Sequence, residues 1–153
     1  MDRLTDNKEL DDEAQSSIRA GLVSLIYGAI PSSIAAILVN SILLAAVQWN
    51  VINHVVISSW LSLVFLVSLF RWWLNREFQA ARPAPDAIDR WRYLALLGVV
   101  LSGLLWGVAG LLLFPPESMP HQVFLAFIIA GMSAGAVTTL SALLPVTLFY
   151  LLA

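Results

Sequence analysis

Apolar residues dominate two long stretches of this chain, and charged residues are confined to the segments around them. Residues 20–70 contain no Asp, Glu, Lys or Arg, and residues 93–153 contain only Glu117. Such stretches are typical of membrane spans, because a helix needs about 20 predominantly apolar residues to cross roughly 30 Å of hydrocarbon. The pattern predicts an all-α, polytopic transmembrane bundle. The expected spans cover residues 21–47, 55–74, 93–114 and 122–144.

Prolines and short polar segments separate these spans. Residues 48–54 connect the first two spans, and residues 74–92 form the main polar loop, in which Pro83 breaks any continuous helix. A proline-rich turn at residues 115–120 precedes the fourth span. The first span is longer than the minimum, and Pro31 is expected to kink it.

Both ends of the chain differ from the spans. Residues 1–19 form an acidic arm that lacks the short basic region of a cleavable signal peptide, so the first span should remain in the mature protein. We expect this arm to be solvated and partly disordered, with a helix near its end as the alternative. The transmembrane domain then covers residues 20–153. Residues 146–153 follow Pro145 and are too short to cross a bilayer, so we expect a truncated fifth helix or a short interfacial tail.

Composition supports a membrane location and narrows the available chemistry. The 153 residues are 59% hydrophobic and 12% charged, whereas soluble domains are roughly 25% charged. The formal net charge of −2 says little, because the charges are gathered in two blocks. The absence of cysteine excludes disulfides, thiolate nucleophiles and thiolate metal sites.

Basic residues lie on only one side of the expected spans. With the N-terminus inside the cell, the inner segments hold all eight basic residues, and the outer loops hold none. The eight are Arg3, Lys8, Arg19, Arg71, Arg76, Arg82, Arg90 and Arg92. By the positive-inside rule this asymmetry predicts a cytoplasmic N-terminus, with the last five arginines as topology determinants. Trp72, Trp73 and Trp91 are expected to anchor the inner interface and Trp49 the outer one.

Two G-x-x-x-G patterns occur in the third and fourth spans, formed by Gly103 with Gly107 and by Gly131 with Gly135. Glycines four residues apart lie on one helix face and allow a neighbouring backbone to approach closely. We expect these glycines to pack the third span against the fourth within one chain. Homodimerisation through one pattern is the alternative.

Uncharged polar residues and tryptophans gather in the outer half of the expected bundle. Asn40 needs a hydrogen-bond partner at membrane depth and is expected to face the bundle interior. Together with Ser59, Trp60 and Trp106, it defines either an interhelical hydrogen-bond cluster or a small ligand pocket. Serines and threonines elsewhere can bond to their own helix backbone and need no function.

Several kinds of chemistry are not supported by the residues present. Arg71 lies near the end of the second span, where we expect it to snorkel to the inner interface, so no charge would remain well inside a span. His54 and His121 are expected to be exposed loop residues, with a shared metal or pH-sensing site as the alternative. No phosphate loop, carboxylate pair or Ser/His/Asp set can be assembled. We expect no enzymatic activity, cofactor, metal or nucleic-acid partner.

Several segments resemble a known class of protein. They are RWRY at 90–93, LSGLLWGVAG at 101–110, FPP at 114–116, HQVFLAFIIAGMSAGAV at 121–137, LP at 144–145 and LFRWW at 69–73. Together they are similar to the N-terminal multi-pass sensor region of bacterial signalling proteins, which precedes GGDEF or EAL domains of cyclic-di-GMP enzymes, or histidine kinase domains. The resemblance implies an input module of the inner membrane, often dimeric, with catalysis confined to a cytoplasmic output domain beyond this chain.

These observations lead to a membrane-embedded sensory module as the expected function. A small transporter or channel subunit that acts as an oligomer is the alternative, and a purely structural assembly protein is a third. The lipid bilayer, a cytoplasmic output domain and a second copy of the chain are the expected partners.

Overall fold

Four α-helices make up the described part of the chain, in a computed structural model that describes residues 2–81, 83 and 88–141. They are α1 (Asp2–Gln48), α2 (His54–Ala81), α3 (Ile88–Leu112) and α4 (Met119–Ser141). No strand occurs among these residues, which confirms the all-α fold. Side chains are described between residues 21 and 137, with residues 22, 26, 82 and 84–87 excepted.

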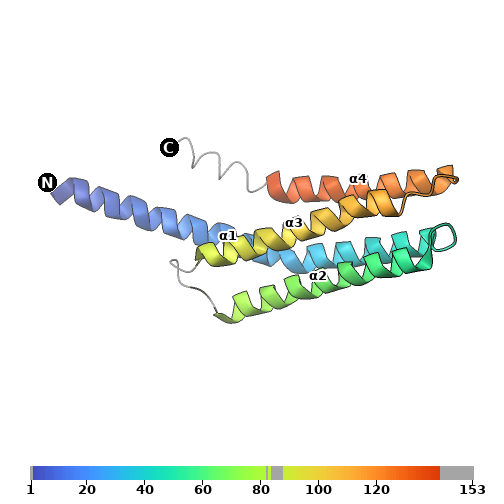
Figure 1. Ribbon diagram of the computed structural model, residues 1–153. Coiled ribbons are helices and arrows are strands. Elements are labelled where there is room, and N and C mark those ends of the chain that lie inside the picture. The colour runs from blue at the N-terminus through green and yellow to red at the C-terminus, as the bar shows by residue number, and fades with distance from the viewer. Residues whose placement is uncertain (1, 82, 84–87, 142–153) are drawn as a thin grey trace.

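The helices run up and down along one bundle. The α1–α2 and α3–α4 connections lie together at one end of it (Figure 1). We name this the hairpin end. The opposite end carries the exposed side chains of Arg76, Arg90 and Arg92, and we name it the basic end.

The first helix is longer than the sequence predicted. α1 begins at Asp2, so the residues expected to form a solvated, partly disordered arm continue the helix of the first span (Figure 1). Residues 2–20 contain no glycine or proline, and acidic residues near a helix N-terminus are stabilised by the macrodipole. Pro31 lies inside the helix, as transmembrane helices tolerate.

α2 and α3 also extend beyond the predicted spans, toward the basic end. α2 ends at Ala81 and α3 begins at Ile88, so much of the loop expected at residues 74–92 is helical. Hydropathy underestimates such helices, because their ends carry charged residues on one face while Phe78 and Ile88 remain buried on the other. α2 stops before Pro83, as the proline-rich break predicted.

One buried side chain fastens the hairpin end. Gln48, the last residue of α1, is fully buried, and its Nε2 donates to the carbonyl oxygens of Leu113 and His121, at 3.3 Å each. Leu113 directly follows α3, and His121 lies in the first turn of α4. Gln48 therefore holds the α3–α4 turn against the end of α1.

The fifth helix expected at residues 146–153 lies outside the described residues.

The buried side chains form two apolar clusters, one toward each end of the bundle. The cluster near the hairpin end includes Ile37, Leu44, Ile57, Trp60, Val64, Trp106, Leu113 and Leu125. The cluster near the basic end includes Val23, Tyr27, Ile30, Leu74, Phe78, Ile88 and Ala95. Between the two clusters, along α2, lie the buried polar residues Ser68 and Arg71. A polar layer thus interrupts the core of the bundle.

Tyr27 is the centre of the basic-end cluster. Its ring stacks on Phe78, with centroids 3.8 Å apart and planes 7° from parallel. Its hydroxyl donates a 3.0 Å hydrogen bond to the carbonyl oxygen of Trp91, and the Tyr27 and Trp91 rings meet edge to face. Trp91, expected as an interface anchor, therefore joins α3 to α1 and α2.

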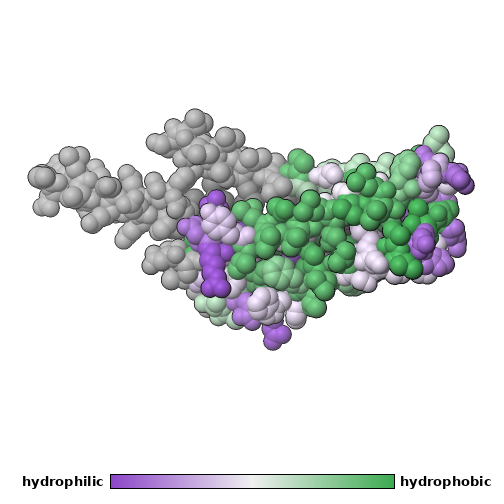
Figure 2. All heavy atoms as spheres, in the orientation of Figure 1, coloured by the Kyte–Doolittle hydropathy of each residue, from purple (hydrophilic) through white to green (hydrophobic). Residues whose placement is uncertain are grey.

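The outer surface of the bundle is suited to lipid. The apolar windows of the four helices are Val23–Gln48, His54–Ala81, Ile88–Leu112 and Met119–Val137, with mean hydropathies between 1.4 and 2.2. Large apolar side chains stand exposed on this surface, among them Val55, Leu111 and Phe127, which are 71%, 81% and 74% exposed. Hydrophobic residues cover the side of the bundle, and hydrophilic ones gather at its two ends (Figure 2). Exposing so large an apolar surface to water would be unfavourable, so the chain is a multi-pass membrane protein.

Candidate functional site

Arg71 lies inside the bundle, in the polar layer between the two apolar clusters. It is 8% exposed. Its Nη1 donates to Oγ of Ser102 on α3, and its Nη2 donates to Oγ of Ser33 on α1, at 3.1 Å each. One side chain of α2 therefore bonds to both neighbouring helices. The prediction that Arg71 snorkels to the membrane surface is wrong.

The direction of α2 explains this outcome. Side chains of an α-helix lean toward its N-terminus, and the N-terminus of α2 is at the hairpin end. Arg71 therefore leans away from the basic end. Its aliphatic stem passes Gly98, and Nη1 reaches Ser102, one turn further along α3 toward the hairpin end.

Gly98 provides the room for this side chain. A Cβ at position 98 would lie 2.9 Å from Cγ and 3.3 Å from Cδ of Arg71. Real carbon atoms do not approach to 2.9 Å, so any larger residue at 98 must displace the arginine.

Both serine partners are oriented by their own helices. Ser33 Oγ donates to the carbonyl oxygen of Ile30 at 3.0 Å, and Ser102 Oγ donates to that of Gly98 at 2.8 Å. Because each hydroxyl hydrogen is used in this way, the oxygen lone pairs are left to accept from the guanidinium. The bonds to Arg71 thus come from neutral acceptors.

No described carboxylate balances the charge of Arg71. Glu77, Asp89 and Glu117 are the acidic residues whose side chains the structure describes, and all three are exposed. A buried cation without an anionic partner is costly, and arginine does not lose its proton in proteins. Intramembrane charges of this kind are rare and usually mark a functional site.

A narrow crevice lies next to Ser102, the partner of Arg71 on α3, toward the hairpin end. It is lined by Ile37 of α1, by Val64, Val67 and Ser68 of α2, and by Ser102, Leu105 and Trp106 of α3. Ser102 is shared between the crevice and Arg71. The crevice is too narrow to admit a water molecule. It is therefore closed in this packing of the helices.

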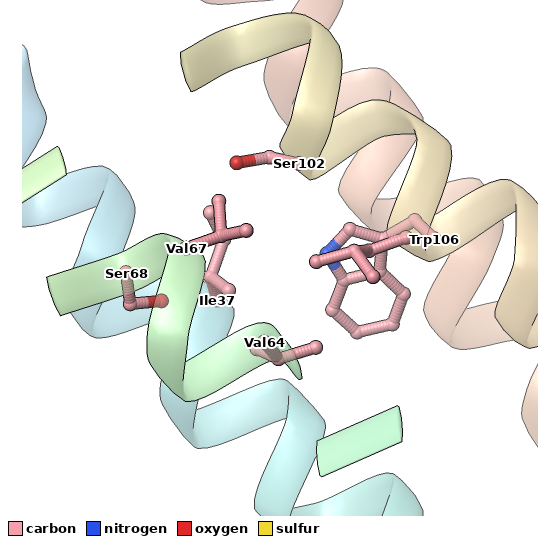
Figure 3. A pocket seen from close by; sticks show the side chains of 7 residues that line it. Ile37, Val64, Val67, Ser68, Ser102 and Trp106 are labelled. Atoms are coloured by element: carbon pink, nitrogen blue, oxygen red, sulfur yellow. The ribbon is translucent and has the colours of Figure 1, made fainter. Parts of the chain in front are cut away.

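Two tryptophans cover the crevice toward the hairpin end. Trp60 and Trp106 meet edge to face, with ring centroids 5.6 Å apart. Trp60 Nε1 donates a 2.9 Å bond to the carbonyl oxygen of Leu105. Trp106 Nε1 is buried and has no hydrogen-bond partner among the described residues. Figure 3 shows this indole nitrogen on the side of the ring that faces the crevice.

The four residues that the sequence suggested for a ligand site do not lie together in the structure. Trp106 lines the crevice, and the Trp60 ring packs against the Trp106 ring. Ser59 is exposed on the outer surface of α2. Asn40 lies on α1 away from the crevice lining, and its Nδ2 donates at 2.9 Å to the carbonyl oxygen of Ala36. Asn40 thus finds a partner for this donor within its own helix, so the donor does not need a partner in the bundle interior.

The four glycines expected to join α3 and α4 do not lie between these helices. They are Gly103, Gly107, Gly131 and Gly135. All four are exposed, and a Cβ at any of them would meet nothing within 4 Å. The prediction that these glycines pack α3 against α4 within one chain is therefore wrong. Homodimerisation through one of the patterns stays a prediction. The closest glycine contact between α3 and α4 is at Gly110, where a Cβ would lie 3.2 Å from Cδ1 of Ile129.

The arginines assigned to topology occupy different environments. Arg76, Arg90 and Arg92 are exposed at the basic end. The guanidinium of Arg76 lies over the Trp72 ring at 5.8 Å from its centroid. Arg82 lies outside the described residues, and Arg71 alone among the described arginine side chains is buried.

Sequence reasoning missed Ser33, Ser68, Gly98 and Ser102 as parts of one site. A signal was present on α2, where Ser68 and Arg71 continue the spacing of the buried Trp60, Val64, Leu74 and Phe78. Residues three and four apart share a helix face. The polar pair therefore belonged to the inward face of α2.

The two histidines lie apart from this site. His54 is exposed and stacks on Trp49, with ring centroids 4.4 Å apart. His121 is half-buried, and its Nδ1 lies 2.6 Å from Ser118 Oγ. Among the described residues, no group of three or more His, Cys, Asp or Glu side chains could hold a metal ion.

No protein-family model, curated protein or solved structure matches this chain.

Proposed function

We propose that this chain is the membrane-embedded input module of a bacterial signal-transduction protein. It lies in the inner membrane with its N-terminus in the cytoplasm, and it passes a change in helix packing to a cytoplasmic output domain.

The polar layer around Arg71 supports this proposal most directly. Three helices meet at one guanidinium, through Ser33 of α1 and Ser102 of α3. A change in the bonding of that group alters how α1 and α3 sit against α2. A signal acts by favouring one of two packings, since a ligand with equal affinity for both states shifts nothing.

Two features of the sequence support the rest of the proposal. The segments at 90–93, 101–110 and 121–137 resemble sensor regions that precede GGDEF, EAL or histidine kinase domains. The basic residues favour a cytoplasmic location for both the N-terminus and the segment between α2 and α3.

The first test is the coding sequence downstream of Ala153. We expect the reading frame to continue into a cyclic-di-GMP or histidine kinase domain. A stop codon directly after Ala153 would contradict the proposal.

The second test measures output from the intact protein. Arg71→Met should change the basal output or abolish the response, because it removes the bonds that tie α1 and α3 to α2. Arg76→Met is the matched control, since it removes an exposed arginine from the same helix. Equal effects of the two variants at equal expression would contradict a role for the polar layer in signalling.

A small transporter or channel subunit, working as an oligomer, is a second candidate. The buried Arg71 favours it, because intramembrane charges also mark substrate pathways. The sequence predicted no charge well inside a span, because Arg71 was expected to reach the membrane surface, whereas the structure buries Arg71 within the bundle. The closed crevice limits this candidate to a mechanism in which the helices move.

Flux into proteoliposomes separates the two candidates. A transporter should give anion uptake above that of empty vesicles, and Arg71→Met should reduce it to background. Uptake equal to empty vesicles would contradict this second candidate.

A further inference from the structure

Hydrogen-bond donors lie on the crevice and next to it, and no described carboxylate is buried there to accept from them. Arg71 and Trp106 are 8% and 7% exposed, and each presents N–H groups to the interior of the bundle. The indole N–H of Trp106 has no partner in the described part of the chain. The hydroxyl of Ser68, which is 5% exposed, lies on the same lining. Figure 3 shows the Ser102 hydroxyl and the Trp106 nitrogen directed into the space between α2 and α3.

The same lining is apolar on its remaining sides. Ile37, Val64, Val67 and Leu105 surround the polar atoms. A ligand suited to this site therefore carries one negative group for Arg71 and Trp106 and an apolar part for the aliphatic side chains. A single negative charge balances the single buried cation, whereas a phosphate would bring excess charge into an apolar core.

We propose that the crevice binds a monocarboxylate, whose carboxylate accepts hydrogen bonds from the guanidinium of Arg71 and from Trp106 Nε1. Guanidinium and carboxylate groups match in geometry and form charge-assisted hydrogen bonds. The apolar chain of the ligand lies along Val64, Val67 and Ile37. That this carboxylate is the signal sensed by the protein rests on the proposed function. That the crevice binds a carboxylate does not.

Binding of this ligand is coupled to helix movement. The crevice admits no water molecule as it stands, so the carboxylate enters only when α3 moves away from α1 and α2. The ligand thus stabilises the open packing over the closed one, which is the differential affinity that a signal requires.

Thermal unfolding of the full chain, purified in a non-ionic detergent, tests the inference. Two arms distinguish the sources of the carboxylate. Sodium butyrate, compared with sodium chloride at equal ionic strength, represents a ligand from water. A long-chain fatty acid, compared with its methyl ester, represents a ligand from the bilayer. We expect at least one carboxylate to raise the Tm saturably, beyond its control compound.

Three variants locate the effect. Trp106→Phe keeps an aromatic ring but loses the N–H, and it should weaken the apparent Kd by about tenfold. Arg71→Met should abolish the saturable shift, and Arg76→Met should keep it. If Arg71→Met does not fold, Arg71→Lys replaces it and should weaken binding at least tenfold, because the planar fork is lost.

Two results would overturn the inference. One is a Tm shift no larger for either carboxylate than for chloride or the methyl ester. The other is an equal shift in wild type and in the Trp106 and Arg71 variants. Because binding is measured on the chain alone, binding without any response of the intact protein's output would contradict the proposed function and leave the carboxylate site standing.

Discussion

Gly98 on α3 lies directly against the side chain of Arg71 on α2, so closely that a Cβ at 98 would be 2.9 Å from the arginine Cγ. The absence of a side chain at one position thus allows a long charged side chain at another to lie between the helices. The arginine in turn reaches Ser102, one turn along α3.

Enlarging residue 98 should destabilise the bundle. Gly98→Val places branched methyl groups where the stem of Arg71 lies, and we expect a loss of about 1–3 kcal/mol in unfolding free energy. Gly103→Val is the matched control on the same helix, because nothing lies within 4 Å of a Cβ there. Thermal unfolding in detergent, followed by circular dichroism, should show a lower Tm for the first variant only. Equal Tm values would show that Arg71 does not need the space at 98.

The bond between Arg71 and Ser102 can be measured with a double-mutant cycle. Ser102→Ala removes an acceptor from a buried cation and should cost about 1–2 kcal/mol in the wild-type background. In an Arg71→Met background the same change should cost much less, because the cation is gone. A cost that is the same in both backgrounds would mean that the two side chains do not interact.

The hydroxyl of Tyr27 should contribute less than the ring on which it stacks. Tyr27→Phe removes the hydrogen bond to the Trp91 carbonyl and should cost about 0.5–1.5 kcal/mol. Phe78→Ala removes the stacked partner of the Tyr27 ring and should cost about 3–5 kcal/mol. Chemical unfolding of both variants gives the comparison. The reverse order would show that the aromatic packing at the basic end is not a main source of stability.

The orientation in the membrane can be read from single cysteines, since the chain contains none of its own. A membrane-impermeant maleimide should label Asn50→Cys, near the hairpin end, from outside intact cells. It should label Gln79→Cys, near the basic end, only after the membrane is opened. Leu66→Cys, on the exposed apolar surface of α2, is the control that should resist labelling in both conditions. Labelling of Gln79→Cys in intact cells would reverse the predicted topology.

The number and type of helices could be predicted from the sequence because lipid imposes a simple requirement. Each span needs a long apolar segment, and the charged or proline-rich segments between spans are easily recognised. Helix ends were less predictable. The part of α2 around Phe78 has charged residues on one face and buried ones on the other, so an average hydropathy hides its continuity.

The interior face of each helix was the main feature that could not be predicted. In lipid, both the interior and the outer surface are apolar, so hydropathy does not separate the face of Val64 from that of Leu66. The glycines at 103 and 131 could have met another helix or the bilayer for the same reason. Arg71 was misplaced because its distance from the span end was considered without the direction of α2, which turns its side chain away from the nearer surface.

The hydrogen bonds that Gln48 donates to two carbonyl oxygens fix the hairpin end of the bundle. Because Gln48 bonds to the carbonyl of Leu113, directly after α3, a slide of α3 along α1 at that end would break this bond. A separation of α3 from α1 and α2 that keeps the Gln48 bonds would be a tilt about the hairpin end, and it would have to break the bond between Tyr27 and Trp91 at the basic end. In such a tilt, a small shift of α3 beside Arg71 would correspond to a larger displacement at the basic end, which lies further from Gln48.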